Sequence, residues 1–109
     1  LKVMSLGATL ISVQTPDRDG KTDEITLNLD NLEAYISGHP SLGSTVGRFA
    51  NRIGQAQFII DGKTHQVTPN SKPHHIHGGR EGFGKLLWNA RTQKDRDSVS
   101  VELSLTSPD

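Results

Sequence analysis

Short runs of apolar and β-branched residues, separated by turn residues, recur along the whole chain. Residues 9–13 follow a glycine and predict a strand, and residues 24–29 place alternate apolar side chains on one face, as a half-buried strand does. Between them, residues 16–20 predict a tight turn, because proline presets φ and the closing glycine accepts a positive φ. Short strands at regular spacing favour an all-β sandwich or barrel.

The second half of the chain predicts two β-hairpins. In the first, residues 58–60 and 63–67 flank Asp61-Gly62, a dipeptide preferred in type I′ turns because both central residues need a positive φ. In the second, residues 86–92 and 98–105 flank a polar loop, and the last run alternates polar with apolar side chains throughout. That alternation is the clearest period-2 pattern in the sequence.

One short helix, from Asp30 to Ser37, is expected to interrupt the strands. Asp30 is placed to cap the first turn, and Glu33 follows three residues later, as in a capping box. Leu32 and Ile36 then share one face of the helix. The glycine and proline that follow predict its end.

Composition narrows the possible classes of function. The 109 residues correspond to one domain or part of one, and 12 basic residues balance 12 acidic ones. Without a basic footprint we expect no nucleic-acid partner, and without an apolar run of roughly 18 residues we expect no membrane partner. The lack of cysteine excludes disulfides and thiolate metal sites. The first residues show no signal-peptide anatomy, which favours a cytoplasmic protein.

The last predicted strand is followed by only a short polar tail. This tail is typical of the start of a loop. An open sheet that stopped there would leave a pairing edge exposed. We therefore expect further chain, or a partner chain, beside that strand.

The first candidate site is the stretch 47–54, which places Arg48, Asn51 and Arg52 among small and apolar residues. If the stretch is irregular or extended, Arg48 and Arg52 point to the same side. Arginine supplies a fixed fork of donors, and asparagine an amide that both donates and accepts, which together suit vicinal sugar hydroxyls. A solvated or ion-paired surface loop explains the same spacing, and both interpretations stay open.

The second candidate site is a histidine cluster that precedes a pair of glycines. In an extended run, His75 and His77 lie on one face and His74 on the other. Such a pair could bind a metal, with His65 or Glu81 as a third ligand. A role in proton exchange, and no role at all on the surface, are the alternatives.

A third stretch, residues 80–88, carries Phe83 between two glycines and ends in Trp88, the only tryptophan. A lone Gly-x-Gly without a clear strand before it and a helix after it is weak evidence for a phosphate loop. Phe83 and Trp88 are therefore expected in the core or in the wall of a cleft.

Taken in order, these stretches resemble the galactose mutarotase (aldose 1-epimerase) family across nearly the whole chain. Residues 47–53 are similar to the family's glycine-arginine-x-alanine-asparagine-arginine-isoleucine motif. Residues 76–79 are similar to its leucine-histidine-glycine-glycine block, with Ile76 in place of leucine. The other matching stretches are residues 7–10, 16–20, 32–35, 61–63, Asn70, residues 82–83 and Trp88.

The resemblance implies an all-β fold with one short helix. Residues 1–109 would form the N-terminal part of a single large antiparallel β-sandwich, the galactose mutarotase-like supersandwich, incomplete alone. Asn51 and Arg52 would contact sugar hydroxyls, and His77 would lie by the ring oxygen as an auxiliary catalytic residue. Arg48 would shape the loop. The resemblance implies no metal and no cofactor.

The implied activity is the interconversion of the α and β anomers of an aldohexose, galactose or glucose, by acid/base ring opening. The family also uses a second histidine as proton donor and a glutamate as proton acceptor, and neither motif occurs in residues 1–109. We therefore expect the principal acid and base in the remaining C-terminal part of the same protein or in a second chain, and the chain alone to be inactive. A non-catalytic carbohydrate-binding module or sugar sensor of the same fold is the main alternative, and a purely structural β domain is another.

Overall fold

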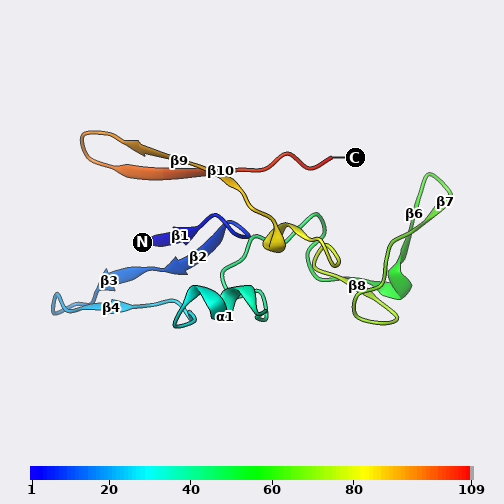
Figure 1. Ribbon diagram of the computed structural model, residues 1–109, viewed down its shortest axis with the longest axis horizontal. Helices are drawn as coiled ribbons and strands as arrows, with labels where there is room; N and C mark the ends of the chain where they lie inside the picture. The colour runs from blue at the N-terminus through cyan, green and yellow to red at the C-terminus, as the bar shows by residue number, and fades with distance from the viewer. Residues whose placement is uncertain (109) are drawn as a thin grey trace.

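The computed structural model describes residues 1–108 and consists mainly of antiparallel strand pairs (Figure 1). Five two-stranded sheets pair β1 with β2, β3 with β4, β5 with β8, β6 with β7, and β9 with β10. The predicted all-β class with one short helix is confirmed. The strands are β1 Lys2–Met4, β2 Thr9–Ser12, β3 Gln14–Pro16, β4 Thr22–Glu24, β5 Arg52–Ile53, β6 Gln57–Ile60, β7 Lys63–Gln66, β8 His75–Ile76, β9 Asn89–Lys94 and β10 Val99–Ser104; the helix is α1 Leu32–Ile36, and 3-10 turns η1 and η2 cover Gly54–Ala56 and Phe83–Lys85.

Both predicted hairpins form. Asp61 and Gly62 join β6 to β7 with φ angles of 51° and 74°, as a type I′ turn requires. Strand β9 begins at Asn89 instead of residue 86. The preceding segment pairs elsewhere, because the Leu86 carbonyl accepts the Gly7 N–H at 2.8 Å. That pairing connects β1 and β2 to the segment leading into the β9–β10 hairpin.

The predicted strand over residues 24–29 is wrong, because β4 ends at Glu24. The Glu24 carboxylate turns back and accepts hydrogen bonds from the Ser12 hydroxyl at 2.5 Å and from the Val13 N–H at 2.9 Å. It also accepts the backbone N–H of Thr26 at 3.1 Å and the Thr26 hydroxyl. These bonds bend the chain after β4, and Leu27 is left 82% exposed.

The helix is shorter than predicted and has a different cap. The N-cap is Asn31, whose Oδ1 accepts the Ala34 N–H at 2.9 Å, so the predicted cap at Asp30 is wrong. The buried side chain is Tyr35, while Leu32 and Ile36 face solvent. Tyr35 lies on the inner face of the helix, where its hydroxyl accepts the Leu29 N–H at 3.1 Å.

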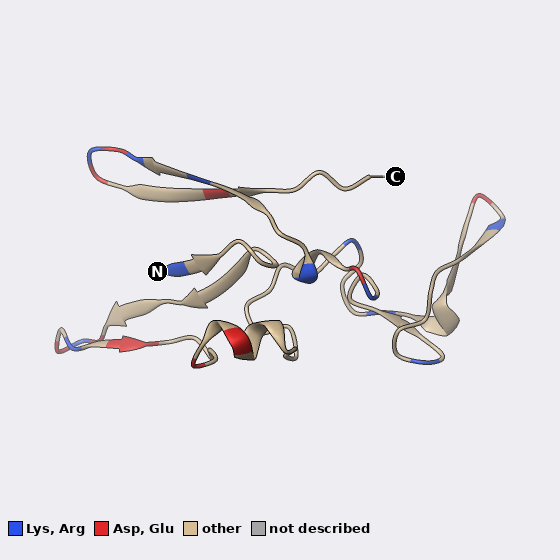
Figure 2. Ribbon diagram, viewed as in Figure 1, with Lys and Arg blue, Asp and Glu red and all other residues tan. Residues whose placement is uncertain are grey.

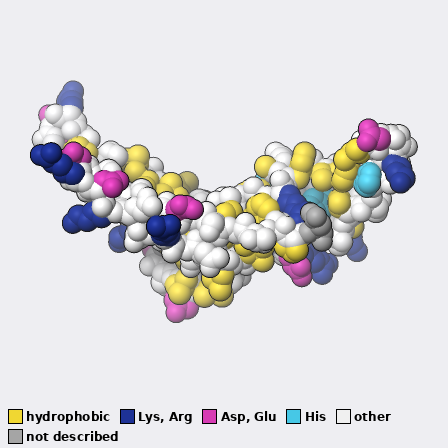
Figure 3. All heavy atoms as spheres, turned by 90° about the horizontal axis from the view of Figure 1, so that it is seen from above, with side chains coloured by type: hydrophobic (Ala, Val, Ile, Leu, Met, Phe, Trp, Pro, Cys, Tyr) yellow, Lys and Arg dark blue, Asp and Glu magenta, His cyan; other side chains and the backbone are white. Residues whose placement is uncertain are grey.

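The described residues form an open, elongated body. The radius of gyration is 17.5 Å, against about 13 Å for a compact chain of 100 residues. Large apolar side chains lie at the surface, and the space-filling view shows them along the curved face of the molecule (Figure 3). Each of its sheets has two strands, and an isolated two-stranded sheet is marginally stable in water.

Charge is distributed without a dominant sign. Lysine, arginine and acidic residues lie scattered over the molecule and mark the tips of hairpins (Figure 2). The ion pairs found in residues 1–108, Arg18–Asp19 at 3.6 Å and Lys21–Asp23 at 4.0 Å, are exposed and contribute little to stability. Over the same residues, no helix combines the length and the apolar character that crossing a membrane demands.

Candidate functional site

Three segments meet through glycines that permit close backbone contact. The carbonyl oxygen of Gly47 accepts the Phe83 N–H at 3.1 Å. A Cβ atom on Gly78 would lie 1.6 Å from that same oxygen, and a Cβ on Gly47 would lie 2.3 Å from the Phe83 ring. Side chains at these glycines would force the segments apart. The glycines of the two candidate motifs therefore allow the motifs to contact each other directly.

The two candidate motifs are also joined by the β5–β8 ladder. Arg52 lies opposite Ile76, and the next residue of β5 lies opposite His75. Beyond the ladder, the His77 N–H donates to the Asn51 carbonyl at 3.1 Å. The Asn51 N–H in turn donates to His77 Nδ1 at 3.1 Å. The structure thus places Asn51, Arg52 and His77 side by side at the surface.

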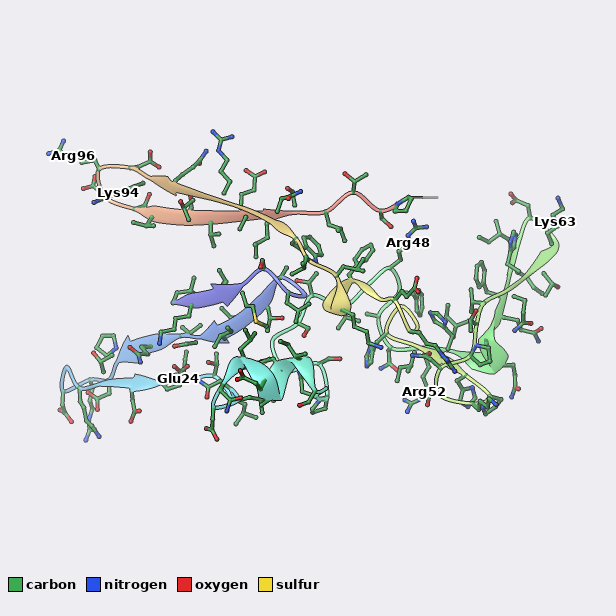
Figure 4. The ribbon with its side chains drawn as sticks, viewed as in Figure 1. Glu24, Arg48, Arg52, Lys63, Lys94 and Arg96 are labelled. Atoms are coloured by element: carbon green, nitrogen blue, oxygen red, sulfur yellow. The ribbon has the colours of Figure 1, made fainter. Side chains whose placement is uncertain are left out.

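Arg52 and Arg48 do not point to the same side, contrary to the prediction. Figure 4 shows Arg48 beside the C-terminal segment and Arg52 on a different side of the molecule. Arg48 donates from Nε to Ser107 Oγ at 2.8 Å and from its guanidinium to the Pro108 carbonyl. Asn51, with a φ of 63°, turns the chain between the two arginines, so the common side predicted for an irregular or extended stretch is wrong.

His75 and His77 also take separate partners instead of sharing a face. His77 has a φ of 52° and lies just outside β8, so the strand ends at Ile76. His75 packs against Gly79, and its Nδ1 lies 2.9 Å from the Thr68 carbonyl oxygen. Across residues 1–108, no three His, Asp or Glu side chains gather in a way that could hold a metal ion. The metal alternative required a third ligand beside His75 and His77, and no such set of three is present among these residues.

Two clefts flank this region. His77 lines one of about 540 Å³, whose wall also includes Tyr35 and His39. The other, of about 960 Å³, is largely apolar and includes Phe58 and Phe83. Asn51 and Arg52 lie outside both clefts and face solvent. Arg52 is exposed, and no carboxylate within residues 1–108 forms an ion pair with it.

Sequence reasoning missed the part played by Asn70. Its side-chain amide donates to the Ile76 carbonyl at 2.9 Å and its Oδ1 accepts the Ile76 N–H at 2.7 Å. In the sequence, Asn70 was notable only as one of the residues that match the family's motifs in order. Trp88, expected in the core or a cleft wall, is half-buried: its Nε1 donates to the Phe83 carbonyl at 3.1 Å, and the two rings meet edge to face at 6.0 Å.

Fold and site together define a mostly-β protein that presents amide, guanidinium and imidazole groups at one surface, held there by glycine-mediated backbone contacts. Comparison of the sequence with known protein families identifies the family. The Aldose 1-epimerase family model matches residues 1–109, the whole chain. This chain belongs to the aldose 1-epimerase family, as its ordered motifs predicted.

Known members of the family agree with this assignment. Over 107 residues the chain is 39% identical to galactose mutarotase from Bos taurus and 37% identical to aldose 1-epimerase from Escherichia coli (strain K12). The crystal structure of galactose 1-epimerase from Lactobacillus acidophilus NCFM matches with a TM-score of 0.83 and 36% identity. Each comparison covers 98% of this chain and 30% of the relative. The chain therefore spans about a third of the length of the relatives it matches.

Proposed function

We propose that the protein containing this chain interconverts the α and β anomers of an aldohexose, galactose or glucose. The observation that carries the proposal is the double hydrogen bond between Asn51 and His77, with Arg52 next in the chain, in a member of the aldose 1-epimerase family. Three relatives are named for mutarotation or epimerisation of galactose or an aldose, and 98% of this chain matches about 30% of each.

The proposed reaction moves two protons. A base removes the proton of the C1 hydroxyl while an acid protonates the ring oxygen, and the bond between C1 and the ring oxygen breaks to give the open aldehyde. Rotation about the C1–C2 bond and the reverse transfers then close the ring as the other anomer. Each well-placed proton transfer contributes typically 10²–10⁴ in rate.

In this scheme the chain's residues bind the sugar and assist at one end of it. Arg52 and Asn51 offer donors and an amide oxygen to sugar hydroxyls, which holds the ring where both proton transfers are geometrically possible. His77 serves as an auxiliary group at the ring oxygen. One histidine cannot act at the ring oxygen and at C1 together, so the principal acid and base belong to polypeptide outside residues 1–109. That polypeptide is either the rest of the same protein or a second chain.

Kinetics of single substitutions in the intact protein test the proposal. Polarimetry of galactose mutarotation should show kcat lowered about 10²-fold by His77→Ala, the low end of the range for general acid catalysis. Arg52→Ala should lower kcat/KM about 10- to 100-fold, which corresponds to hydrogen bonds from a charged group. His65→Ala, on the β6–β7 hairpin, and Arg96→Ala, between β9 and β10, are matched controls and should leave both parameters unchanged.

Three outcomes separate the possibilities. Unchanged kinetics in His77→Ala would remove that residue from the site. Sugar binding by calorimetry without any rate effect in the intact protein would favour a non-catalytic carbohydrate-binding module. If the intact protein shows neither sugar binding nor activity, a purely structural β domain is the remaining interpretation.

A further inference from the structure

The hydrogen-bond partner of the His77 ring fixes the position of its proton. The backbone N–H of Asn51 points at His77 Nδ1 across 3.1 Å. A backbone N–H can only donate, so Nδ1 must carry a lone pair. In the neutral imidazole one nitrogen is protonated and the other is not. The proton of neutral His77 therefore lies on Nε2.

The segment that leads into His77 is held from its other side by Asn70. The Asn70 amide bonds both the N–H and the C=O of Ile76, at 2.7 and 2.9 Å. Ile76 lies opposite Arg52 in the β5–β8 ladder, and the Asn70 side chain satisfies both of its backbone polar groups. The Asn70 side chain thus makes the two hydrogen bonds that a neighbouring strand would make to Ile76. It anchors the backbone immediately before His77.

We propose that Asn70 is a positioning residue for His77: by clamping Ile76 it keeps the Asn51 N–H on His77 Nδ1, so that the imidazole presents an Nε2–H donor to the ligand. This inference rests on the proposed function for its consequence but not for its geometry. A sugar ring oxygen carries lone pairs and needs a donor facing it. The opposite tautomer would turn a lone pair toward that oxygen and would lose the bond to Asn51.

A neighbouring histidine provides an internal control. His75 Nδ1 lies 2.9 Å from the Thr68 carbonyl oxygen, which can only accept. Neutral His75 must therefore carry its proton on Nδ1, the reverse of His77. His74 resembles His77, because its Nδ1 accepts the Gln55 N–H at 3.2 Å. Two histidines two residues apart are thus predicted to hold opposite tautomers.

Nitrogen-15 NMR of the histidine rings in the intact protein tests the assignment. Spectra are recorded well above the ordinary histidine pKa of about 6.5, and His77 is assigned by the signals lost in His77→Ala. For His77 we expect a protonated Nε2 and an unprotonated Nδ1, with the opposite pattern for His75. A protonated Nδ1 in His77 would overturn the proposal, even if every Asn70 variant failed to fold.

Substitution of Asn70 tests the positioning role. Asn70→Ala removes both bonds to Ile76, and Asn70→Asp keeps an acceptor for the Ile76 N–H but cannot donate to its carbonyl. Both should mix the two tautomers of His77 in the NMR spectrum and lower kcat about 10- to 100-fold, as small misplacements of a catalytic group do. The control is Asn28→Ala, because Asn28 is an exposed asparagine in the segment between β4 and α1.

The two readouts separate this inference from the proposed function. If the intact protein shows no mutarotation but Asn70→Ala still mixes the His77 tautomers, the proposed function fails and the positioning role stands. If Asn70→Ala folds and leaves the His77 signals like those of Asn28→Ala, the positioning role is wrong, whatever the activity.

Discussion

Gly78→Ala is the substitution for which the structure makes the sharpest prediction of stability. Gly78 has a φ of 80°, and a Cβ atom there would lie 1.6 Å from the Gly47 oxygen, 2.5 Å from the Gly47 carbonyl carbon and 3.0 Å from the Arg48 nitrogen. All three atoms belong to backbone, so no side chain can rotate away. The segments that carry Arg48 and His77 must therefore separate by well over an ångström.

Two costs add in this variant. A left-handed backbone costs a residue with a Cβ about 1–2 kcal/mol, and forcing extra volume into a packed contact costs about 1–3 kcal/mol. We expect Gly78→Ala to lower the free energy of unfolding by about 2–5 kcal/mol. Alanine substitutions at two other glycines separate the backbone cost from the packing cost. Gly62 has a φ of 74° and Gly54 has no positive φ, and a Cβ added at either would meet no atom within 4 Å.

Urea unfolding of the intact protein measures the three variants. Gly62→Ala should lose only the backbone cost of about 1–2 kcal/mol, and Gly54→Ala should stay within about 0.5 kcal/mol of the parent. Gly78→Ala should also weaken sugar binding, because it moves His77 relative to Asn51. A Gly78→Ala variant no less stable than Gly62→Ala would refute the close contact between the two motifs.

Three further predictions concern β4 and α1. The Ser12 hydroxyl above all, with further hydrogen bonds from Thr26 and Val13, lowers the pKa of Glu24 from 4.5 to about 2; its contribution to stability is therefore complete above pH 4.5 and is lost as pH falls toward 2. Urea unfolding across that window should show a flatter pH dependence in Glu24→Gln, and equal slopes would contradict this. Tyr35→Phe leaves the Leu29 N–H without its acceptor and should cost about 1–3 kcal/mol, measured by the same method; no loss would mean that this N–H finds another partner. Asn31→Ala removes the helix cap and should cost about 1 kcal/mol, whereas Asp30→Ala, as control, should cost little, and the reverse order would restore Asp30 as the cap.

Local chemistry made parts of the fold predictable from sequence. Asp61-Gly62 specified its turn because few other residue pairs accept two positive φ angles. The turn over residues 16–20 also formed: Gly20 has a φ of 81°, and the Asp17 carboxylate accepts the Asp19 and Lys21 N–H groups, both at 2.9 Å. In each case the determining interactions lie within a few residues of one another.

Predictions that depended on distant partners were wrong. The alternation after Glu24 was typical of a strand, but hydrogen bonds from Ser12, the last residue of β2, and from the adjoining Val13 bend the chain there. The shared face of His75 and His77 assumed an extended backbone, whereas the bond to Asn51 holds His77 in a left-handed conformation. Periodicity carries no information about such contacts.

The sequence suggested which residues belong to the candidate site, but it did not specify how they are arranged. Ordered motifs pointed to Asn51, Arg52 and His77, and the structure places them together. That Arg48 turns away, and that Asn70 clamps the backbone before His77, follows only from three-dimensional contacts. Arg48 bonds Ser107 and Pro108, and the Asn70 side chain bonds the backbone of Ile76. Sequence patterns do not specify such partners, because they come together only in the folded chain.

Polarimetry of freshly dissolved α-galactose, with the intact protein and with isolated residues 1–109, tests the central claim most directly. The intact protein should accelerate mutarotation far above the buffer rate. The isolated chain should leave that rate unchanged, because the two proton transfers need groups it does not supply. Acceleration by the isolated chain, or none by the intact protein, would contradict the division of labour proposed between this chain and the polypeptide outside it.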